Sequence, residues 1–403
     1  MIDRNRRASF LAALTAGAML PLFAAAAVPN PPPTLCVDGA ACVKTSATSP
    51  SQGIKYHPGH YAWFAPKRWF RIDEAETIAE VKTFIDSIAG ESTVKGIQLA
   101  TLWRALEGRT AGDYSAGFAA MDQILAHAKA RNKRVMLALF TGWSGNIDSD
   151  YTIFPDYIVN GSSYGITVSS QIAKPTRFAR SWQQATNDRI IALVQAYGAR
   201  YNGNPYLEMV NFGETAIGGV TTDGFSNQAL LAQMQRLIVA TRAAWPNTGL
   251  RIGANDLAPD SLMTQLFTTC EKYACAVGGP DVWPATVTQA DRVFAGLDQY
   301  QKQVYTDYRD RMPWAIEIQS PELAGQWTPK ELYDATVYGY YATQDKFAVP
   351  SMKTKYVIWY VNTGWTGGAA QAWSTGELPF IRSTGGNVHS TTCPTTYPSC
   401  ITN

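Results

Sequence analysis

The sequence predicts an α/β protein of the (β/α)8 barrel (TIM barrel) class, a single domain with a long loop after its third strand. Short apolar runs alternate with segments of helical periodicity, and the tally of apolar runs is eight. Strands that are apolar on both faces and are separated by helices indicate a buried parallel sheet. The chain has 403 residues, of which 46% are hydrophobic and 16% charged. A barrel of this kind routinely exceeds 250 residues in one domain, so the length requires no second domain.

The first half of the predicted barrel runs from residue 54 to about residue 212. Apolar residues at helical spacing, such as Ile78, Val81, Phe84 and Ile85, mark its first helix. The segment 144–180 is expected to be irregular, is too long for a simple connection, and is predicted to shape a cleft. We expect strands at 60–64, 94–102, 135–140 and 207–212, and helices at 75–88, 115–131 and 181–201.

The second half repeats the alternation. The predicted strands are 250–254, 274–278, 314–318 and 356–360, and the helices are 227–245, 261–273, 289–311 and 330–344. An open doubly wound sheet is the rival architecture. No dinucleotide or phosphate-binding glycine motif follows any strand, and an even count of eight favours a closed barrel.

Residues 1–27 are predicted to be an export signal. Arg4, Arg6 and Arg7 precede a small and apolar run that ends in four alanines. The arginine pair resembles a twin-arginine signal, although a Sec route fits nearly as well. Residues 28–53 form a linker rich in proline and serine, and 54–403 the barrel. We therefore expect a secreted or periplasmic protein with no membrane span.

The formal charge of +2 belongs to this leader. Its removal takes away three arginines and one aspartate, which leaves 31 basic and 31 acidic residues in the mature chain. Binding to nucleic acid requires an excess of Lys and Arg, so no nucleic-acid partner is expected.

The six cysteines fall into three close pairs. Their spacings do not match those of zinc sites, and an oxidising compartment favours bridges, so three small disulfide loops are expected. The pairs are Cys36/Cys42, Cys270/Cys275 and Cys393/Cys400.

The candidate site lies at the carboxyl ends of the strands, where barrel enzymes build their active sites. Glu214 follows the apolar run of the fourth strand, and Glu317 is embedded in the seventh. A carboxylate within a buried strand is rarely found unless it is paired or functional. The structural alternative is that either glutamate caps a helix or forms an ion pair. Glu107, Asp256, Asp281 and Glu322 are fallback carboxylates.

With these two glutamates the chain resembles the clan A glycoside hydrolases, retaining barrel enzymes with a glutamate ending strands four and seven. The resemblance implies that Glu214, in Asn-Phe-Gly-Glu, is the general acid/base and that Glu317, in Ala-Ile-Glu-Ile, is the nucleophile. The family usually carries Asn directly before the acid/base. Here Gly213 holds that position and Asn211 lies three residues before Glu214.

Tryptophans are the second indication of a sugar substrate. Six of the twelve lie at or just beyond predicted strand ends, including Trp63 and Trp365. Flat indoles with a polar edge match the apolar faces and polar rims of sugar rings. Arg104 is expected either to orient the nucleophile or to cap a strand. The predicted substrate-binding residues are Trp103, Arg104, Trp143, Asn211, Asn255, Asp256, Trp283, Gln319 and Trp359.

The sequence thus predicts a secreted glycoside hydrolase that cleaves a poly- or oligosaccharide as a monomer. The alternative from another class is a non-catalytic barrel that binds carbohydrate, and transglycosylation would use the same residues. No cofactor and no metal are expected: nucleotide fingerprints and serine-hydrolase elbows are missing from the sequence, and the histidines are few.

Overall fold

The computed structural model describes residues 52–66, 71–144, 153–169, 176–215, 217, 220–254, 257–279, 307–318, 329–330, 353–362 and 373–403, with only the backbone of residues 143, 144, 169, 214 and 362. The predicted leader, the linker up to residue 51 and most of the predicted helices 289–311 and 330–344 lie outside these residues.

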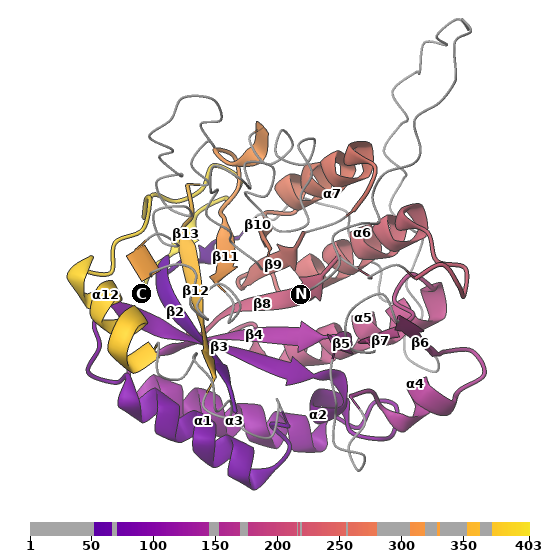
Figure 1. The fold of residues 1–403 in the computed structure, drawn as a ribbon, viewed down its shortest axis with the longest axis horizontal. Helices are drawn as coiled ribbons and strands as arrows, with labels where there is room; N and C mark the ends of the chain where they lie inside the picture. The colour runs from indigo at the N-terminus through magenta and orange to yellow at the C-terminus, as the bar shows by residue number, and fades with distance from the viewer. Residues whose placement is uncertain are drawn as a thin grey trace, which may run out of the picture. The chain divides into compact units, whose positions relative to one another are not determined.

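Eight parallel strands form the barrel, as predicted (Figure 1). Their order around the sheet follows the chain, and in the described residues helices connect the first six strands on the outside. The strands are β2 (Gly59–Ala65), β3 (Val94–Leu102), β4 (Arg134–Phe140), β8 (Leu207–Glu214), β9 (Gly249–Gly253), β10 (Ala276–Gly278), β11 (Ala315–Ile318) and β12 (Tyr356–Asn362).

The barrel closes between β10 and β11. Val277 forms a parallel bridge with Trp314, and its amide donates to the Pro313 carbonyl at 3.0 Å. The Glu317 amide donates to the Gly279 carbonyl at 3.2 Å. A Cβ on Gly278 would lie 1.8 Å from the Ala315 oxygen, so this seam requires glycine. The sixth strand is shorter than predicted because Ala274, with φ of 55°, still belongs to the turn that ends the preceding helix.

The long helices pack apolar faces against the strands, as their spacing predicts. In α1, Val81 and Ile85 are fully buried, and in α6 the Ser226 side chain caps the first turn by accepting from the Ala229 amide at 3.1 Å. Among the described helices none is long and apolar enough to cross a membrane. The principal helices are α1 (Ala75–Ser87), α3 (Ser115–Ala130), α5 (Gln184–Tyr201), α6 (Asn227–Ala244) and α7 (Asp260–Lys272).

The segment after the third strand is more ordered than predicted. Instead of an irregular loop it contains helix α4 (Asp156–Asn160) and three antiparallel strands, β5 (Gly142–Ser144), β6 (Ile166–Ser169) and β7 (Thr176–Ala179). This small sheet lies beside the arrowhead ends of β4 and β8 (Figure 1). The strands of antiparallel hairpins need only short runs of alternating apolar and polar residues, which are difficult to recognise in a mostly polar segment.

A second small sheet pairs both ends of the described chain. β1 (Ile54–Lys55) runs parallel to β13 (Cys400–Ile401). The predicted Cys393–Cys400 disulfide is present, with a sulfur–sulfur distance of 2.07 Å. The Cys270–Cys275 prediction is wrong, because both thiols are free and buried, with Cys270 hydrogen-bonded to Cys275. Cys36 and Cys42 lie outside the described residues.

Candidate active site

Glu317 lies near the carboxyl end of β11 and is 7% exposed. Both Gln98 of β3 and Arg251 of β9 bond the same carboxylate oxygen. Gln98 Nε2 donates to Oε1 at 2.7 Å, and Arg251 Nη1 donates to it at 2.8 Å. Neither β3 nor β9 is adjacent to β11 in the sheet, so these bonds cross the barrel interior. Within the part of the chain that the structure describes, no hydrogen bond reaches Oε2 of Glu317.

Arg251 is anchored to the strand that carries Glu317. Its Nε donates to the Ala315 carbonyl at 2.8 Å, two residues before the glutamate. The side chain is 2% exposed, so the ion pair with Glu317 is shielded from water. A buried carboxylate needs such a charged and hydrogen-bonded partner. Arg251 thereby holds the Glu317 carboxylate at a fixed position relative to the backbone of β11.

Asn211 of β8 supports Gln98 from the opposite side. Its Nδ2 donates a short hydrogen bond to Gln98 Oε1. Asn211 is 1% exposed and is register-paired with Arg251 across β8 and β9. The prediction that Asn211 binds substrate is therefore replaced by a buried contact with another protein side chain.

Glu214 is the last residue of β8, as the prediction of a strand-end glutamate requires. Its side chain lies outside what the structure describes. The pairing of β8 with β9 shifts between Phe212 and Glu214, so Gly213 forms a bulge directly before the glutamate. Bulges beside active sites redirect the side chains that follow them. Gly253 lies against this bulge, where a Cβ would be 3.2 Å from the Gly213 carbonyl.

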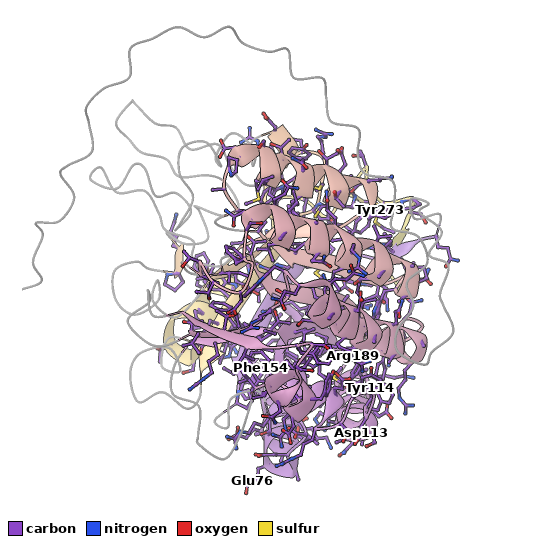
Figure 2. All side chains as sticks on the ribbon, turned by 90° about the vertical axis from the view of Figure 1, so that its right-hand side faces the viewer. Glu76, Asp113, Tyr114, Phe154, Arg189 and Tyr273 are labelled. Carbon is purple, nitrogen blue, oxygen red and sulfur yellow. A yellow bond between two sulfur atoms is a disulfide. The ribbon has the colours of Figure 1, made fainter. Side chains whose placement is uncertain are left out.

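Three predicted residues gather elsewhere, around helix α2 (Trp103–Glu107). The Trp103 indole is fully buried and donates to Glu107 Oε2 at 2.6 Å, so it has no face for a sugar. Glu107 also accepts from Tyr157, from the Gly112 amide and from Arg189, which lies within the packed side chains of Figure 2. This fallback carboxylate therefore has a structural environment.

Arg104 does not reach Glu317. Its Nη1 lies 3.6 Å from Asp156 Oδ1 of α4, and its side chain is 10% exposed. Of the two predicted roles of Arg104, the one that requires contact with Glu317 is wrong, because within the described residues Arg251 makes the charged contact with that glutamate. The ion pair instead links α2 to the segment after the third strand.

Trp359 faces outward from β12, contrary to its predicted role. The indole is fully buried and stacks on His60, and its Nε1 donates to His60 Nδ1 at 2.9 Å. Burial lowers the pKa of His60 to about 4, so the ring is neutral and its Nε2 donates to the Asn387 carbonyl at 3.0 Å. Trp359 is thus part of the layer between the strands and the outer helices.

Trp63 belongs to an aromatic group within the barrel. Its ring stacks on Phe140 of β4 at 6.0 Å and meets the edge of Tyr360 of β12 at 4.9 Å. Trp63 is register-paired with Gln98, which contacts Glu317. Its indole nitrogen is buried without a hydrogen-bond partner among the described residues. Among the strand-end tryptophans whose side chains the structure describes, Trp63 lies on the strand next to Gln98.

Several predicted residues lie outside the described side chains. Trp143 lies in β5, paired with Arg177, but its side chain is outside the described atoms. The remaining predicted positions and fallback carboxylates fall outside the described residues: Asn255, Asp256, Trp283, Gln319, Asp281, Glu322 and Trp365.

Sequence reasoning missed Gln98 and Arg251, although a signal for both existed. Each is a polar residue inside an otherwise apolar strand, the criterion that selected Glu317. It also missed Glu377, at the end of the π-helix η1 (Trp373–Glu377). Glu377 is fully buried with no partner for either oxygen among the described residues, and burial raises its pKa well above the ordinary value. In the described part of the chain, no cluster of His, Cys, Asp and Glu suits a metal ion.

Comparison with known proteins finds similarity in structure alone. No family model matches the chain, and no curated protein matches its sequence. A β-1,4-D-mannanase from Cryptopygus antarcticus superposes with a TM-score of 0.52 and 12% identity over 85% of this chain and 99% of its own. An exo-β-1,4-mannosidase from Opitutaceae bacterium strain TAV5 superposes with a TM-score of 0.52 and 10% identity, over 84% of this chain and 62% of its own. The catalytic domain of a β-amylase from Paenibacillus polymyxa superposes with a TM-score of 0.50 and 10% identity, over 82% of this chain and 100% of its own. At these identities the chain shares with these glycoside hydrolases the (β/α)8 barrel fold.

Proposed function

We propose that the protein is an exported glycoside hydrolase that cleaves O-glycosidic bonds of a poly- or oligosaccharide by a retaining mechanism. The observation that carries the proposal is the environment of Glu317. One carboxylate oxygen is held by Gln98 and Arg251, while no described hydrogen bond occupies the other. Glu214 ends the fourth strand, so both glutamates belong to the carboxyl end of the barrel. The barrel fold shared with glycoside hydrolases supports the same reading.

In the first step Glu214 donates its proton to the glycosidic oxygen as that oxygen leaves the anomeric carbon. Oε2 of Glu317 attacks the same carbon and forms a glycosyl ester. In the second step Glu214 takes a proton from water, whose oxygen displaces Glu317 and restores its carboxylate. Two inversions give net retention, which requires the carboxyl groups to lie roughly 5–5.5 Å apart.

Hydrolysis is tested with purified protein on a panel of β-1,4-mannan, starch and other neutral glycans. Wild-type protein is expected to release reducing ends, and Glu317→Gln to bind the same glycan without cleaving it. Glu76→Gln is the matched control, since Glu76 lies at the outer edge of the molecule in Figure 2. Binding without release by the wild type would favour a carbohydrate-binding barrel, and longer products would reveal transglycosylation.

The retaining mechanism has its own test. A 2-deoxy-2-fluoro glycoside of the cleaved sugar should label wild-type protein, and the mass shift should map to the peptide that contains Glu317. Proton NMR at early times should show the product with the anomeric configuration of the substrate. An inverted product would contradict the nucleophilic role of Glu317.

Export is tested in a bacterial host. The mature protein is expected outside the cytoplasm with its new N-terminus after Ala27. Replacing Arg6 and Arg7 by Lys should block a twin-arginine route and leave Sec-dependent export intact. Full-length protein retained in the cytoplasm of an export-competent host would contradict the signal assignment.

A further inference from the structure

We propose that Asn211 is a positioning residue for Glu317 that acts through the Gln98 amide and does not touch the substrate. The inference rests on the proposed function, because it assigns Glu317 a role in catalysis. The two side chains form a chain of hydrogen bonds across the barrel, from β8 to β3 to β11. Its last member is the carboxylate oxygen that Arg251 also contacts.

The direction of these hydrogen bonds follows from the chemistry of the Glu317 carboxylate, which is the last group in the series. An ionised carboxylate only accepts hydrogen bonds, so Gln98 must turn its NH2 group toward Glu317. The Gln98 carbonyl oxygen then faces Asn211, which must in turn present its own NH2 group. Asn211 therefore supplies the donor that fixes the Gln98 amide in the orientation that the carboxylate requires.

Burial separates this role from substrate binding. Gln98 is 0% exposed and Asn211 is 1% exposed, so both are enclosed by protein. Asn211 and Arg251 are partners in the β8–β9 register. One pair of neighbouring strands thus supplies both supports of Glu317, directly through Arg251 and indirectly through Asn211.

Loss of Asn211 removes the constraint on the Gln98 amide. If the amide turns over, its carbonyl oxygen faces Glu317 Oε1, and two partial negative charges meet where a hydrogen bond stood. The carboxylate then leaves its position relative to the anomeric carbon. A misplaced nucleophile lowers kcat, whereas contacts that bind the distant sugar units and set KM stay in place.

A double-mutant cycle with Gln98→Leu and Asn211→Leu tests the inference, with β-1,4-mannan first and then whichever panel glycan the wild type cleaves. Each single variant is expected to lose about 10- to 100-fold in kcat with KM within threefold, since each disturbs a hydrogen bond chain to a charged group. The double variant should match Gln98→Leu, because among the described residues the Asn211 side chain bonds only to Gln98. The inference would be overturned if the kcat losses of the two single variants multiplied in the double variant, or if Asn211→Leu changed KM.

A conservative set guards against variants that fail to fold. Asn211→Asp should turn the Gln98 amide over, because a carboxylate at position 211 accepts and cannot donate, and a crystal structure would show the changed contacts. Gln98→Glu should place a second carboxylate beside Glu317 and move the acidic limb of the kcat profile to higher pH. Unchanged kcat in Asn211→Asp, with Tm within a few degrees of wild type, would contradict the positioning role. A wild type inactive on the whole panel would overturn the proposed function and this inference together.

Discussion

Two buried glutamates at opposite ends of the barrel have different surroundings. At the amino end, Glu208 of β8 accepts from the His57 amide at 2.8 Å, from His57 Nδ1 at 2.7 Å and from the Tyr356 hydroxyl at 2.9 Å, with Arg134 at 3.8 Å. At the carboxyl end, Glu317 has two donors on one oxygen and no described donor on the other.

The difference lies in how many of the two carboxylate oxygens the described residues occupy. Burial alone would raise the pKa of Glu208, but the hydrogen bonds and charge of His57, with the charge of Arg134, lower it. Both oxygens of Glu208 are occupied, and β1 and β13 lie at the same end of the strands as His57. Glu317 is also held by two donors, but among the described residues none bonds to its Oε2. In a barrel, this is the expected division between the stabilising end and the reactive end.

The largest predicted effect is that of Glu317→Gln on activity. Because an amide is a poor nucleophile, kcat should fall by about a thousandfold or more. The Tm should fall as well, because the amide can still accept from Gln98 and Arg251 but leaves the buried Arg251 charge without its carboxylate. Initial rates and thermal unfolding measure the two effects. An active Glu317→Gln protein would remove the distinction between the two ends.

Glu208→Gln should lower stability without lowering kcat. Breaking the buried pair with His57 and Arg134 is expected to lower the free energy of unfolding by about 3 kcal/mol, with kcat of the remaining folded protein near wild type. The lowered pKa of Glu208 means that its contribution is present above the ordinary pKa of 4.5 and is lost as pH falls. Urea titrations at several pH values should therefore show acid sensitivity in wild type that the variant lacks. If the free energy of unfolding depended on pH equally in wild type and Glu208→Gln, this assignment would be contradicted.

Gly253→Ala should disturb the carboxyl end selectively. The new methyl group would press on the Gly213 carbonyl at 3.2 Å and move the bulge before Glu214. We expect a loss of about tenfold in kcat and of roughly 1–2 kcal/mol in stability from overpacking. Gly203→Ala is the control, because its Cβ would meet nothing within 4 Å. Identical kinetics of the two variants would show that the bulge has no influence on the site.

Glu377→Gln extends the comparison to a carboxyl without described partners. Burial raises the pKa of Glu377, so the contribution of this residue to stability should be fully present below about pH 4.5 and should be lost as pH rises toward the folded-state pKa. The variant should lack this decrease and gain on the order of 1 kcal/mol at neutral pH. Thermal unfolding from pH 4 to 8 measures it, with Glu76→Gln as the exposed control. A destabilised variant at pH 8 would reveal a partner for the ionised carboxylate.

The barrel could be predicted because its signals are local. Each strand is marked by an apolar run and each helix by apolar residues at helical spacing. The strand predicted at 94–102 and the helix predicted at 75–88 match the structure within one residue. The three-stranded sheet after β4 was missed because its strands are short and lie among polar residues. The Cys270–Cys275 prediction failed although the two thiols face each other, because closeness in sequence does not by itself supply the specific geometry of a disulfide.

By itself the sequence determined the number and order of strands, since periodicity and polarity are properties of neighbouring residues. It also singled out Glu317, because a charge within an apolar strand is visible without coordinates. Only the tertiary structure decided which partners that charge receives. Gln98 and Asn211 are 219 and 106 residues away from Glu317 along the chain, and Arg251 is 66 residues away. Barrel closure brings them together, and closure depends on the packing of all eight strands.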